Sequence, residues 1–580
     1  RMPFQYKGER TMTWSVKERK KECEPDYLFQ IFSEKEWEEY PFAGEEKLQW
    51  FRDARLGLFF HVGISAVGGV DIGWPRQTHK LPDPGQGTVP DEVYDSWAGQ
   101  IKMENFYAEE WIDLAIKGGF RYVVIITKHH DGFHMWDTAW SEYKITNAPM
   151  GRDYLKELID ACHERKMPVG LYYSQRDWHH EDYEPVDAAI AERSENIPFY
   201  EIKDGKEWRY GKRHTDYIRY LHRTVLELMK KYGKIDILWW DACWFGGMFT
   251  EPMWETLKLE KEVRKCQPHI LINNRASVPG DFDTPECRVG FMQRDRAWET
   301  CMPMGREWAW TGNGLKPWEE IMHEFLYSVC GDGNYLLSIG AMPDGKIAPE
   351  ETEYIIRTGK WMKQYGESVY GTRSGPWNPG NYGGSTFRGK TIYLHLLNRP
   401  LQEKLILPFP IEGGKVQEIT CMSGSMPDII LEKGKLELTN ICIPETCVDL
   451  ILRIQMENEM ELSLQGIDVE QPLDCFRKEP ALYGSVLAFC GEEKKEFFCD
   501  LGQLHKATGI QGEFRRGKLA LALSADGISW ETCNTGEWGI GKPQLILKSY
   551  EAGMESVGKT ARFIRIKAEN EMKNIEVFGF

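Results

Sequence analysis

The sequence predicts an α/β fold, a (β/α)8-like barrel followed by all-β domains. Two observations predict the barrel. Short apolar runs alternate with amphipathic segments over about 300 residues, and polar residues stand at the same end of several of these runs. A third observation marks where the barrel ends, because short β-rich runs at close spacing begin after Gly375. A doubly wound open sheet is the alternative. No GxGxxG motif follows a strand, so a nucleotide-binding fold has little support.

The barrel elements follow one another along the chain after a polar, charged N-terminal arm of about 50 residues. The expected strands are short buried runs at 56–61, 122–127, 168–174, 234–241, 270–273 and 335–339. The expected helices carry a helical apolar period at 108–117, 154–165, 215–231, 254–266, 318–330 and 349–365. A loop rich in glycine and proline follows the first strand at 69–87, and loops of this kind often line a site.

Three domains are expected from these patterns. Residues 1–375 form the barrel with its N-terminal arm, residues 376–455 a β-sandwich, and residues 456–580 a further all-β unit.

Composition narrows the class of function. A formal net charge of -17 argues against nucleic acid and anionic membranes as partners, and no apolar run is long enough for a transmembrane helix. The 14 cysteines are scattered without a CxxC pair, which predicts a reducing, cytoplasmic location and no structural metal. The N-terminus as it stands lacks the apolar core of a signal peptide. The 22 tryptophans exceed what a core needs, and surplus tryptophan is typical of carbohydrate-active proteins or of interfaces.

Polar residues at the ends of separate strands indicate one site at the C-terminal mouth of the barrel. Any one of these residues could be a helix cap or a core hydrogen bonder, but their convergence favours a site. They are His61, His129, His130, Tyr173, Asp241 and Arg275.

The absence of several known motifs narrows the reactions that the site is expected to catalyse. There is no GxSxG nucleophile elbow and no glycine-rich phosphate loop after a strand, so neither a serine hydrolase nor a redox cofactor is expected. The only dense cluster of metal-ligand types is His129, His130 and Asp131, and adjacent residues at a strand end are expected to point to opposite sides. We therefore predict no metal and no cofactor.

Glycosidic cleavage needs two carboxyl groups, one ionised and one protonated. Asp241 follows the central strand inside a nest of tryptophans and supplies the first, although it could instead cap the next helix. Glu286 or Glu299, in the loops expected after the next strands, supplies the second.

Six motifs together resemble the α-L-fucosidases of glycoside hydrolase family 29 over roughly residues 40–375. They are LGLFFHVG at 56–63, YVVIITKHHDGFHMWDT at 122–138, LWWDACW at 238–244, NNR at 273–275, GDFDTPE at 280–286 and GDGNYLLSIGAMPDGKI at 331–347.

The resemblance implies a retaining, exo-acting hydrolase of terminal α-linked fucose in oligosaccharides or glycoproteins. It implies that Asp241 is the nucleophile and Glu286 the acid/base, with Glu299 in reserve. Many members carry Glu before the tryptophan of the first loop, where this chain has Gly73. The residues implied to hold the sugar are His61, Trp74, His129, His130, Tyr173, Trp239 and Arg275.

The C-terminal segment resembles a discoidin-like (coagulation-factor type C) module through DLG at 500–502, the SADGISW run at 524–530 and the closing IEVFGF. Such modules often bind glycans, though a packing role is an equal alternative. The altered first loop and this module favour α-1,3/1,4 branches of Lewis-type glycans. The rival interpretations are a non-catalytic glycan-binding protein on the same scaffold and a retaining hydrolase for a related sugar such as galactose.

Overall fold

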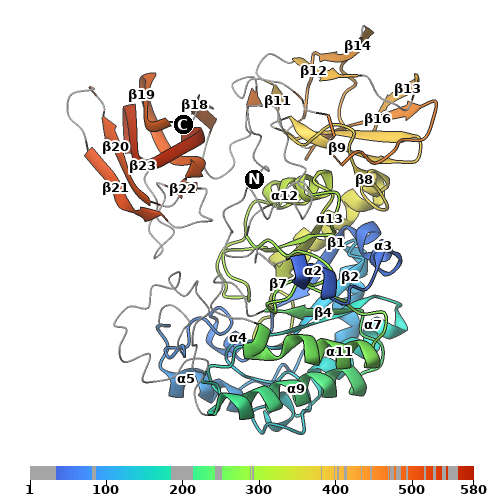
Figure 1. The fold of residues 1–580 in the computed structure, drawn as a ribbon, viewed down its shortest axis with the longest axis vertical. Helices are drawn as coiled ribbons and strands as arrows, with labels where there is room; N and C mark the ends of the chain where they lie inside the picture. Colours follow the sequence, from blue (N-terminus) through green and yellow to red (C-terminus); the bar gives the residue numbers. More distant parts are fainter. Residues whose placement is uncertain are drawn as a thin grey trace. The chain divides into compact units, whose positions relative to one another are not determined.

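A computed structural model gives the fold of the chain (Figure 1). It describes residues 34–80, 87–184, 213–241, 251–287, 289, 293–380, 382–397, 399–400, 404–409, 414–432, 434–444 and 447–464, and separate stretches between 466 and 579. Within these residues, 34–287, 289 and 296–371 belong to one compact unit, and 293–295 with the residues from 372 onward belong to another.

The first unit is built on a parallel sheet of seven strands in the order β5-β4-β3-β2-β1-β7-β6. Strands that follow one another in sequence therefore lie side by side, except β5 and β6, which lie at the two ends of this order, and β7 returns to pair with β1, as in a barrel. The strands are β1 (Leu56–Phe60), β2 (Tyr122–Lys128), β3 (Val169–Tyr173), β4 (Ile237–Trp240), β5 (Leu271–Ile272), β6 (Glu299–Pro303) and β7 (Asn334–Ile339).

Residues 281–287 continue the ring between β5 and β6. A parallel bridge joins Asn273 to Phe282, and two more join Asp283 to Trp298 and Glu286 to Cys301. Gly280 makes the turn into this segment with a φ of 62°, where a Cβ would lie 2.4 Å from the backbone of Asn273. Neither this pairing nor β6 was expected, because both segments are polar and carry proline.

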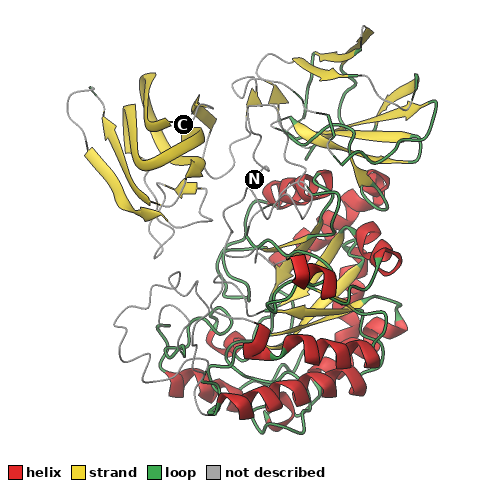
Figure 2. Ribbon diagram, in the orientation of Figure 1, coloured by secondary structure: helices red, strands yellow, loops and turns green. Residues whose placement is uncertain are grey.

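The helices lie around the sheet (Figure 2). The six expected helices are confirmed with shifts of at most two residues at their ends, and their burial fits a helix that faces a sheet. They are α6 (Ala108–Lys117), α7 (Tyr154–Glu164), α9 (His214–Lys231), α11 (Thr256–Cys266), α12 (Trp318–Cys330) and α13 (Pro349–Tyr365). Further α-helices are α2 (Glu34–Glu39), α3 (Glu45–Ala54), α4 (Ser65–Gly68), α5 (Asp91–Ser96) and α10 (Glu251–Trp254). Within the described ranges, no helix is long and apolar enough to cross a membrane.

Side chains alternate between the two faces of the strands, and β4 shows this clearly. Ile237 and Trp239 belong to the core enclosed by the sheet. Trp240 faces the helices instead, and its indole Nε1 donates to Glu260 of α11 at 3.0 Å. The register pairs Tyr172 of β3 with Trp239 and Tyr173 with Trp240, so Tyr172 faces inward and Tyr173 outward.

The second unit is rich in strands. One antiparallel sheet runs β13-β16-β10-β9-β8, a three-stranded sheet runs β12-β15-β14, and β11 pairs with β17. These strands are β8 (Arg373–Ser374), β9 (Gly383–Arg388), β10 (Thr391–Leu396), β11 (Arg399–Pro400), β12 (Lys404–Pro408), β13 (Val416–Cys421), β14 (Asp428–Glu432), β15 (Lys435–Thr439), β16 (Leu450–Met456) and β17 (Phe476–Arg477). Leu394, Leu405, Leu436 and Leu452 lie in one buried apolar core, which joins the first two of these sheets.

The last sheet runs β21-β20-β23-β19-β22, with β18 paired to β23. Its strands are β18 (Ser485–Cys490), β19 (Lys494–Phe514), β20 (Gly517–Ser524), β21 (Glu531–Trp538), β22 (Gln544–Ile546) and β23 (Lys559–Gly579). Most of the SADGISW run lies outside the described residues. The division at residue 455 stays a prediction.

Candidate active site

The centre of the site is a pair of carboxylates held by one guanidinium. Asp241 follows β4 directly, Arg275 lies just beyond β5, and Glu286 lies near the end of the 281–287 segment. Nη1 of Arg275 donates to Oδ1 of Asp241 at 3.0 Å and to Oε2 of Glu286 at 2.7 Å. Thr284 fixes the other side of the guanidinium, since its Oγ1 accepts from Nε and its backbone oxygen from Nη2, both at 2.9 Å.

The two carboxyl groups differ in how far they are buried. The side chain of Asp241 is 9% exposed and that of Glu286 is 29% exposed. Burial raises the pKa of Asp241 from 3.8 to about 6, against the opposing effects of Arg275 and of a hydrogen bond from Tyr172. Asp241 is therefore enclosed, whereas Glu286 has a path to solvent.

The tyrosine against Asp241 is Tyr172, and the prediction of Tyr173 is wrong in its placement. The hydroxyl of Tyr172 donates to Oδ2 of Asp241 at 2.5 Å. The hydroxyl of Tyr173 bonds to Oγ1 of Thr224 on α9 at 2.7 Å, on the outer face of the sheet. The strand parity is the reason, because Tyr173 shares its face with the outward Trp240.

Three buried histidines gather at the ends of β1 and β2, as predicted. The rings of His129 and His130 lie 4.0 Å apart, and His61 lies 6.3 Å from His129 between centroids. Desolvation lowers the pKa of His61 to about 3 and the pKa values of His129 and His130 well below 6.5. All three rings are therefore neutral near pH 7.

Aromatic rings form the wall around these groups. His129 stacks on Tyr172 at 5.5 Å, Tyr172 stacks on Trp239 at 5.7 Å, and the Arg275 guanidinium lies 4.6 Å from the centre of the Trp239 ring. Trp74 is half-buried in the first loop and meets His130 edge-on at 5.3 Å.

Glu299 lies apart from the carboxylate pair. It begins β6 and is wholly buried, where it accepts hydrogen bonds from the Tyr122 hydroxyl and from Nε1 of Trp239, the latter at 2.9 Å. Its ladder partner Asn334 is the first residue of β7, so Glu299 sits at the amino end of the sheet, whereas Asp241 follows the carboxyl end of β4. Burial raises the pKa of Glu299 to about 7.

The first loop approaches His129 closely at Gly73. Its φ is 73°, and a Cβ there would lie 2.6 Å from Nδ1 of His129. The backbone N–H of Gly73 donates to the Tyr94 hydroxyl, which donates in turn to Asp131, each at 2.8 Å. These two hydrogen bonds hold Gly73 in place against His129.

The histidines also bear on metal binding. Ligand atoms of His129, His130 and Asp241 all lie within 4.8 Å of one another. The expectation that His129 and His130 point to opposite sides is wrong, because an irregularity between Ile126 and Lys128 interrupts the strand parity just before them. Two imidazoles and a carboxylate suit zinc, but Arg275 places a positive charge 3.0 Å from Asp241 and so opposes a cation there.

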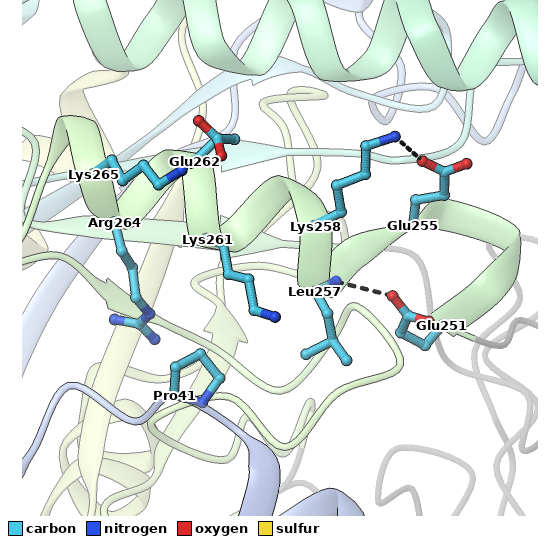
Figure 3. A pocket seen from close by; sticks show the side chains of 9 residues that line it. All are labelled: Pro41, Glu251, Glu255, Leu257, Lys258, Lys261, Glu262, Arg264 and Lys265. Carbon is cyan, nitrogen blue, oxygen red and sulfur yellow. Dashed lines mark hydrogen bonds and ion pairs between the residues drawn. The ribbon is translucent and has the colours of Figure 1, made fainter.

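A separate hollow of about 750 Å³ lies over α10 and α11 (Figure 3). Charged side chains of both signs line it, and several bond to each other, as Lys258 does to Glu255 at 2.7 Å. None of its lining residues belongs to the carboxylate site.

Sequence reasoning missed Tyr172, Ser174, Trp308 and Ser338. Ser174 and Ser338 bond to Nδ1 of His130 and of His61, and the Trp308 ring lies 5.1 Å from His61. The parity of β3 against β4 was the signal that could have identified Tyr172. The serines and Trp308 carry no local signal of this kind.

A curled parallel sheet covered by helices, with two carboxyl groups close together at the carboxyl end of its strands, is the arrangement found in glycoside hydrolases of the barrel type. Comparison with known proteins then gives the family. A family model described as alpha-L-fucosidase matches residues 32–367, and the chain belongs to that family.

Relatives of the chain agree with this assignment. The tissue alpha-L-fucosidase of Mus musculus is 26% identical over 425 residues, which are 68% of this chain and 87% of the relative. The tissue alpha-L-fucosidase of Homo sapiens is 26% identical over 392 residues, 62% of this chain and 78% of the relative.

Solved structures also match. Alpha-L-fucosidase isoenzyme 1 from Paenibacillus thiaminolyticus has a TM-score of 0.60 at 27% identity, and the match covers 72% of this chain and all of the other. A Bacteroides thetaiotaomicron alpha-L-fucosidase, solved as a trapped covalent intermediate with 2-fluoro-fucosyl fluoride, has a TM-score of 0.59. It is 22% identical, covers 75% of this chain and 99% of its own, and so supports the fold.

Proposed function

We propose that the protein is a retaining exo-α-L-fucosidase, which removes terminal α-linked fucose from oligosaccharides and glycoconjugates. The observation that carries the retaining mechanism is the shared contact of Asp241 and Glu286 with one nitrogen of Arg275. The two bonded oxygens cannot lie further apart than those bonds laid end to end, 3.0 and 2.7 Å. Retaining glycosidases hold their carboxyl groups about 5–5.5 Å apart and inverting ones about 6.5–9.5 Å, so this spacing supports retention.

In the proposed reaction, Asp241 attacks the anomeric carbon while protonated Glu286 gives its proton to the leaving oxygen. The glycosidic bond breaks and an ester to Asp241 forms. Glu286, now a carboxylate, takes a proton from water, which attacks the same carbon and releases fucose and Asp241. The partial exposure of Glu286 suits a group that meets both the leaving group and water. The trapped intermediate of the Bacteroides relative supports this course.

Neutral imidazoles suit a sugar, because they hydrogen-bond hydroxyls without demanding a counter-charge. In this proposal His61, His129 and His130 meet the ring hydroxyls and Tyr172 steadies the nucleophile. Trp74 and Trp239 offer apolar faces. Burial of the three histidines, Tyr172 and Trp239 favours a terminal sugar over a residue within a chain.

The substrate preference belongs to the same proposal. We propose α-1,3/1,4 branches of Lewis-type glycans as preferred substrates, on the grounds of the small residue at Gly73 and the C-terminal all-β region. Residues 456–580 are proposed as a discoidin-like glycan-binding module, and the six-stranded sheet of β18 to β23 is compatible with this.

The test is release of free L-fucose from an aryl α-fucoside, 2-fucosylated lactose, and Lewis-type trisaccharides with and without sialic acid. An Asp241→Ala variant is the control and should bind fucose without turnover. Proton NMR of the first-formed sugar anomer reads retention directly, and initial formation of the β-anomer would contradict it. Folded protein that binds fucose but releases none from any substrate would favour a glycan-binding role, and the pattern across the panel tests the Lewis preference.

A further inference from the structure

Two site histidines each share a hydrogen bond with a buried serine from a neighbouring strand region. Nδ1 of His61 lies 2.7 Å from Oγ of Ser338 on β7. Nδ1 of His130 lies 2.6 Å from Oγ of Ser174, directly after β3. Both serines are buried, with 1% and 0% of their surface exposed.

Each serine has a second partner that fixes its proton. Oγ of Ser338 lies 3.0 Å from the backbone oxygen of Trp308, and Oγ of Ser174 lies 3.1 Å from that of Arg176. A hydroxyl has one proton to donate, and a carbonyl oxygen can only accept. The proton of each serine therefore points to a backbone carbonyl.

The bond to each imidazole must then run the other way, with Nδ1–H as the donor and the serine oxygen as the acceptor. Ser174 has its full complement of partners, because its oxygen also accepts from the backbone N–H of Arg176 at 3.1 Å. A neutral ring protonated at Nδ1 carries its lone pair at Nε2.

We propose that Ser338 and Ser174 are positioning residues that hold His61 and His130 as Nδ1–H tautomers, so that both rings present Nε2 to the sugar as hydrogen-bond acceptors. The site then recognises two sugar hydroxyls as donors. This inference rests on the proposed function for the identity of the sugar, though not for the tautomers.

Two further observations support the assignment. Burial lowers the pKa of His61 to about 3 and that of His130 well below 6.5, so that neither ring carries a second proton near pH 7. Nε2 of His130 lies 3.8 Å from Oδ2 of Asp241, beyond hydrogen-bond distance, so no hydrogen bond from Nε2 to Asp241 competes with the bond from Nδ1 to Ser174.

His129 is the internal comparison. Its Nδ1 is buried without a hydrogen-bond partner among the described residues and faces Gly73. No hydroxyl fixes its tautomer from behind, so we assign it none.

The first experiment reads the tautomers directly. The full-length protein is labelled with ¹⁵N at its 14 histidines, and two-bond proton–nitrogen correlation spectra distinguish protonated from unprotonated ring nitrogens. Loss of one ring's signals in His61→Asn and in His130→Asn assigns the spectra. We expect Nδ1–H for both rings, and an Nε2–H form of either in the wild-type protein would overturn the proposal without any variant.

Serine variants test the cause. Ser338→Ala should shift His61 toward a mixture of tautomers and leave His130 unchanged, and Ser174→Ala should do the reverse. Ser328→Ala is the matched control, because Ser328 is equally buried and, among the described residues, its hydroxyl bonds only to the backbone oxygen of Glu324, at 2.7 Å. A cognate ring unmoved in either folded serine variant would contradict the role of that serine.

The second experiment uses sugar ligands to test whether Nε2 of His61 and of His130 accept hydrogen bonds. Inhibition constants are measured for L-fucose and for analogues in which one ring hydroxyl is replaced by hydrogen or by fluorine, which cannot donate. At two positions the fluoro and deoxy analogues should lose affinity alike, by about 3- to 10-fold. In Ser338→Ala the fluoro analogue should regain affinity over the deoxy analogue at one of these positions.

Fluoro analogues that retain affinity over deoxy analogues at every position in the wild-type protein would mean that the rings donate, and would overturn the proposal. Failure of unmodified L-fucose to bind would count against the proposed function instead, while the spectra would still decide the tautomers.

Discussion

Replacing Tyr172 with phenylalanine should move the acid side of the pH–rate profile upward. The Tyr172 hydroxyl donates to Oδ2 of Asp241 at 2.5 Å, and this bond favours the ionised carboxylate. A hydrogen bond to a charged group contributes about 1.5–3 kcal/mol, and one pH unit corresponds to about 1.4 kcal/mol. Loss of the bond should therefore raise the pKa of Asp241 by about 1 to 2 pH units above its present value of about 6.

The sign follows from the proposed role of Asp241 as the nucleophile, which must be ionised. Activity rises with pH as Asp241 loses its proton, so a higher pKa removes activity at pH 6 first and much less at pH 8. The assay is kcat/KM for an aryl α-fucoside between pH 4.5 and 9, because this parameter reports ionisation in the free enzyme.

Tyr173→Phe is the matched control, since it removes the same hydroxyl one residue along, where the bond is to Thr224 on the outer face. The acid limb of the pH–rate profile of Tyr173→Phe should coincide with that of the wild-type protein. An unmoved limb in Tyr172→Phe, or an equal shift in both variants, would refute the reasoning that Tyr172 alone supports Asp241.

Three other predictions concern the carboxyl groups and the first loop. Glu286→Ala should lose at least 10²-fold more activity on a natural glycan than on a substrate with a good leaving group, and azide should restore part of the rate; the same pattern in Glu299→Gln would move the acid/base assignment there. The pKa of Glu299 is raised from 4.5 to about 7, so its contribution to folding is present below pH 4.5 and is lost as pH rises through 7. Glu299→Gln should therefore gain about 3 kcal/mol of unfolding free energy relative to wild type between pH 4.5 and 8, as measured by urea denaturation, and parallel curves would count against a buried, titrating Glu299. Gly73→Ala and Gly69→Ala both place alanine at a φ above 60° and should each lose about 1 kcal/mol of unfolding free energy, but only Gly73→Ala should weaken fucose binding, because nothing lies within 4 Å of a Cβ at Gly69. Equal fucose affinity in the two glycine variants would show that His129 tolerates the added atom.

The sequence predicted those parts of the barrel in which local pattern and final environment agree. β2 and β4 are apolar because both of their faces are covered, and α9 has a helical period because one face meets the sheet. The 281–287 segment and β6 escaped prediction because tertiary partners compensate their polar residues. Asp283, for example, is paired with Arg296 at 2.9 Å. The local residue propensities of a segment carry no information about such an ion pair.

The same limit explains the outcome at the site. Which residues follow a strand could be read from the sequence, and that brought Asp241, Arg275 and the histidines together. Which of two adjacent tyrosines faces inward depends on register against a neighbouring strand, and Tyr173 was wrong for this reason. The choice between Glu286 and Glu299 likewise depends on the fact that Glu299 begins β6 and so lies at the amino end of the sheet, which the sequence does not show.

The position of Arg275 between the two carboxylates fits the charge changes of the proposed reaction. The proposed reaction starts with Asp241 ionised and with a proton on Glu286 that is donated to the leaving group. After the first step Asp241 is a neutral ester and Glu286 is the carboxylate. Because Nη1 of Arg275 bonds to both groups, at 3.0 and 2.7 Å, it faces one negative charge at each stage and need not move. The charge passes from one partner of the guanidinium to the other, so the stabilisation that keeps Asp241 ionised also favours proton donation by Glu286.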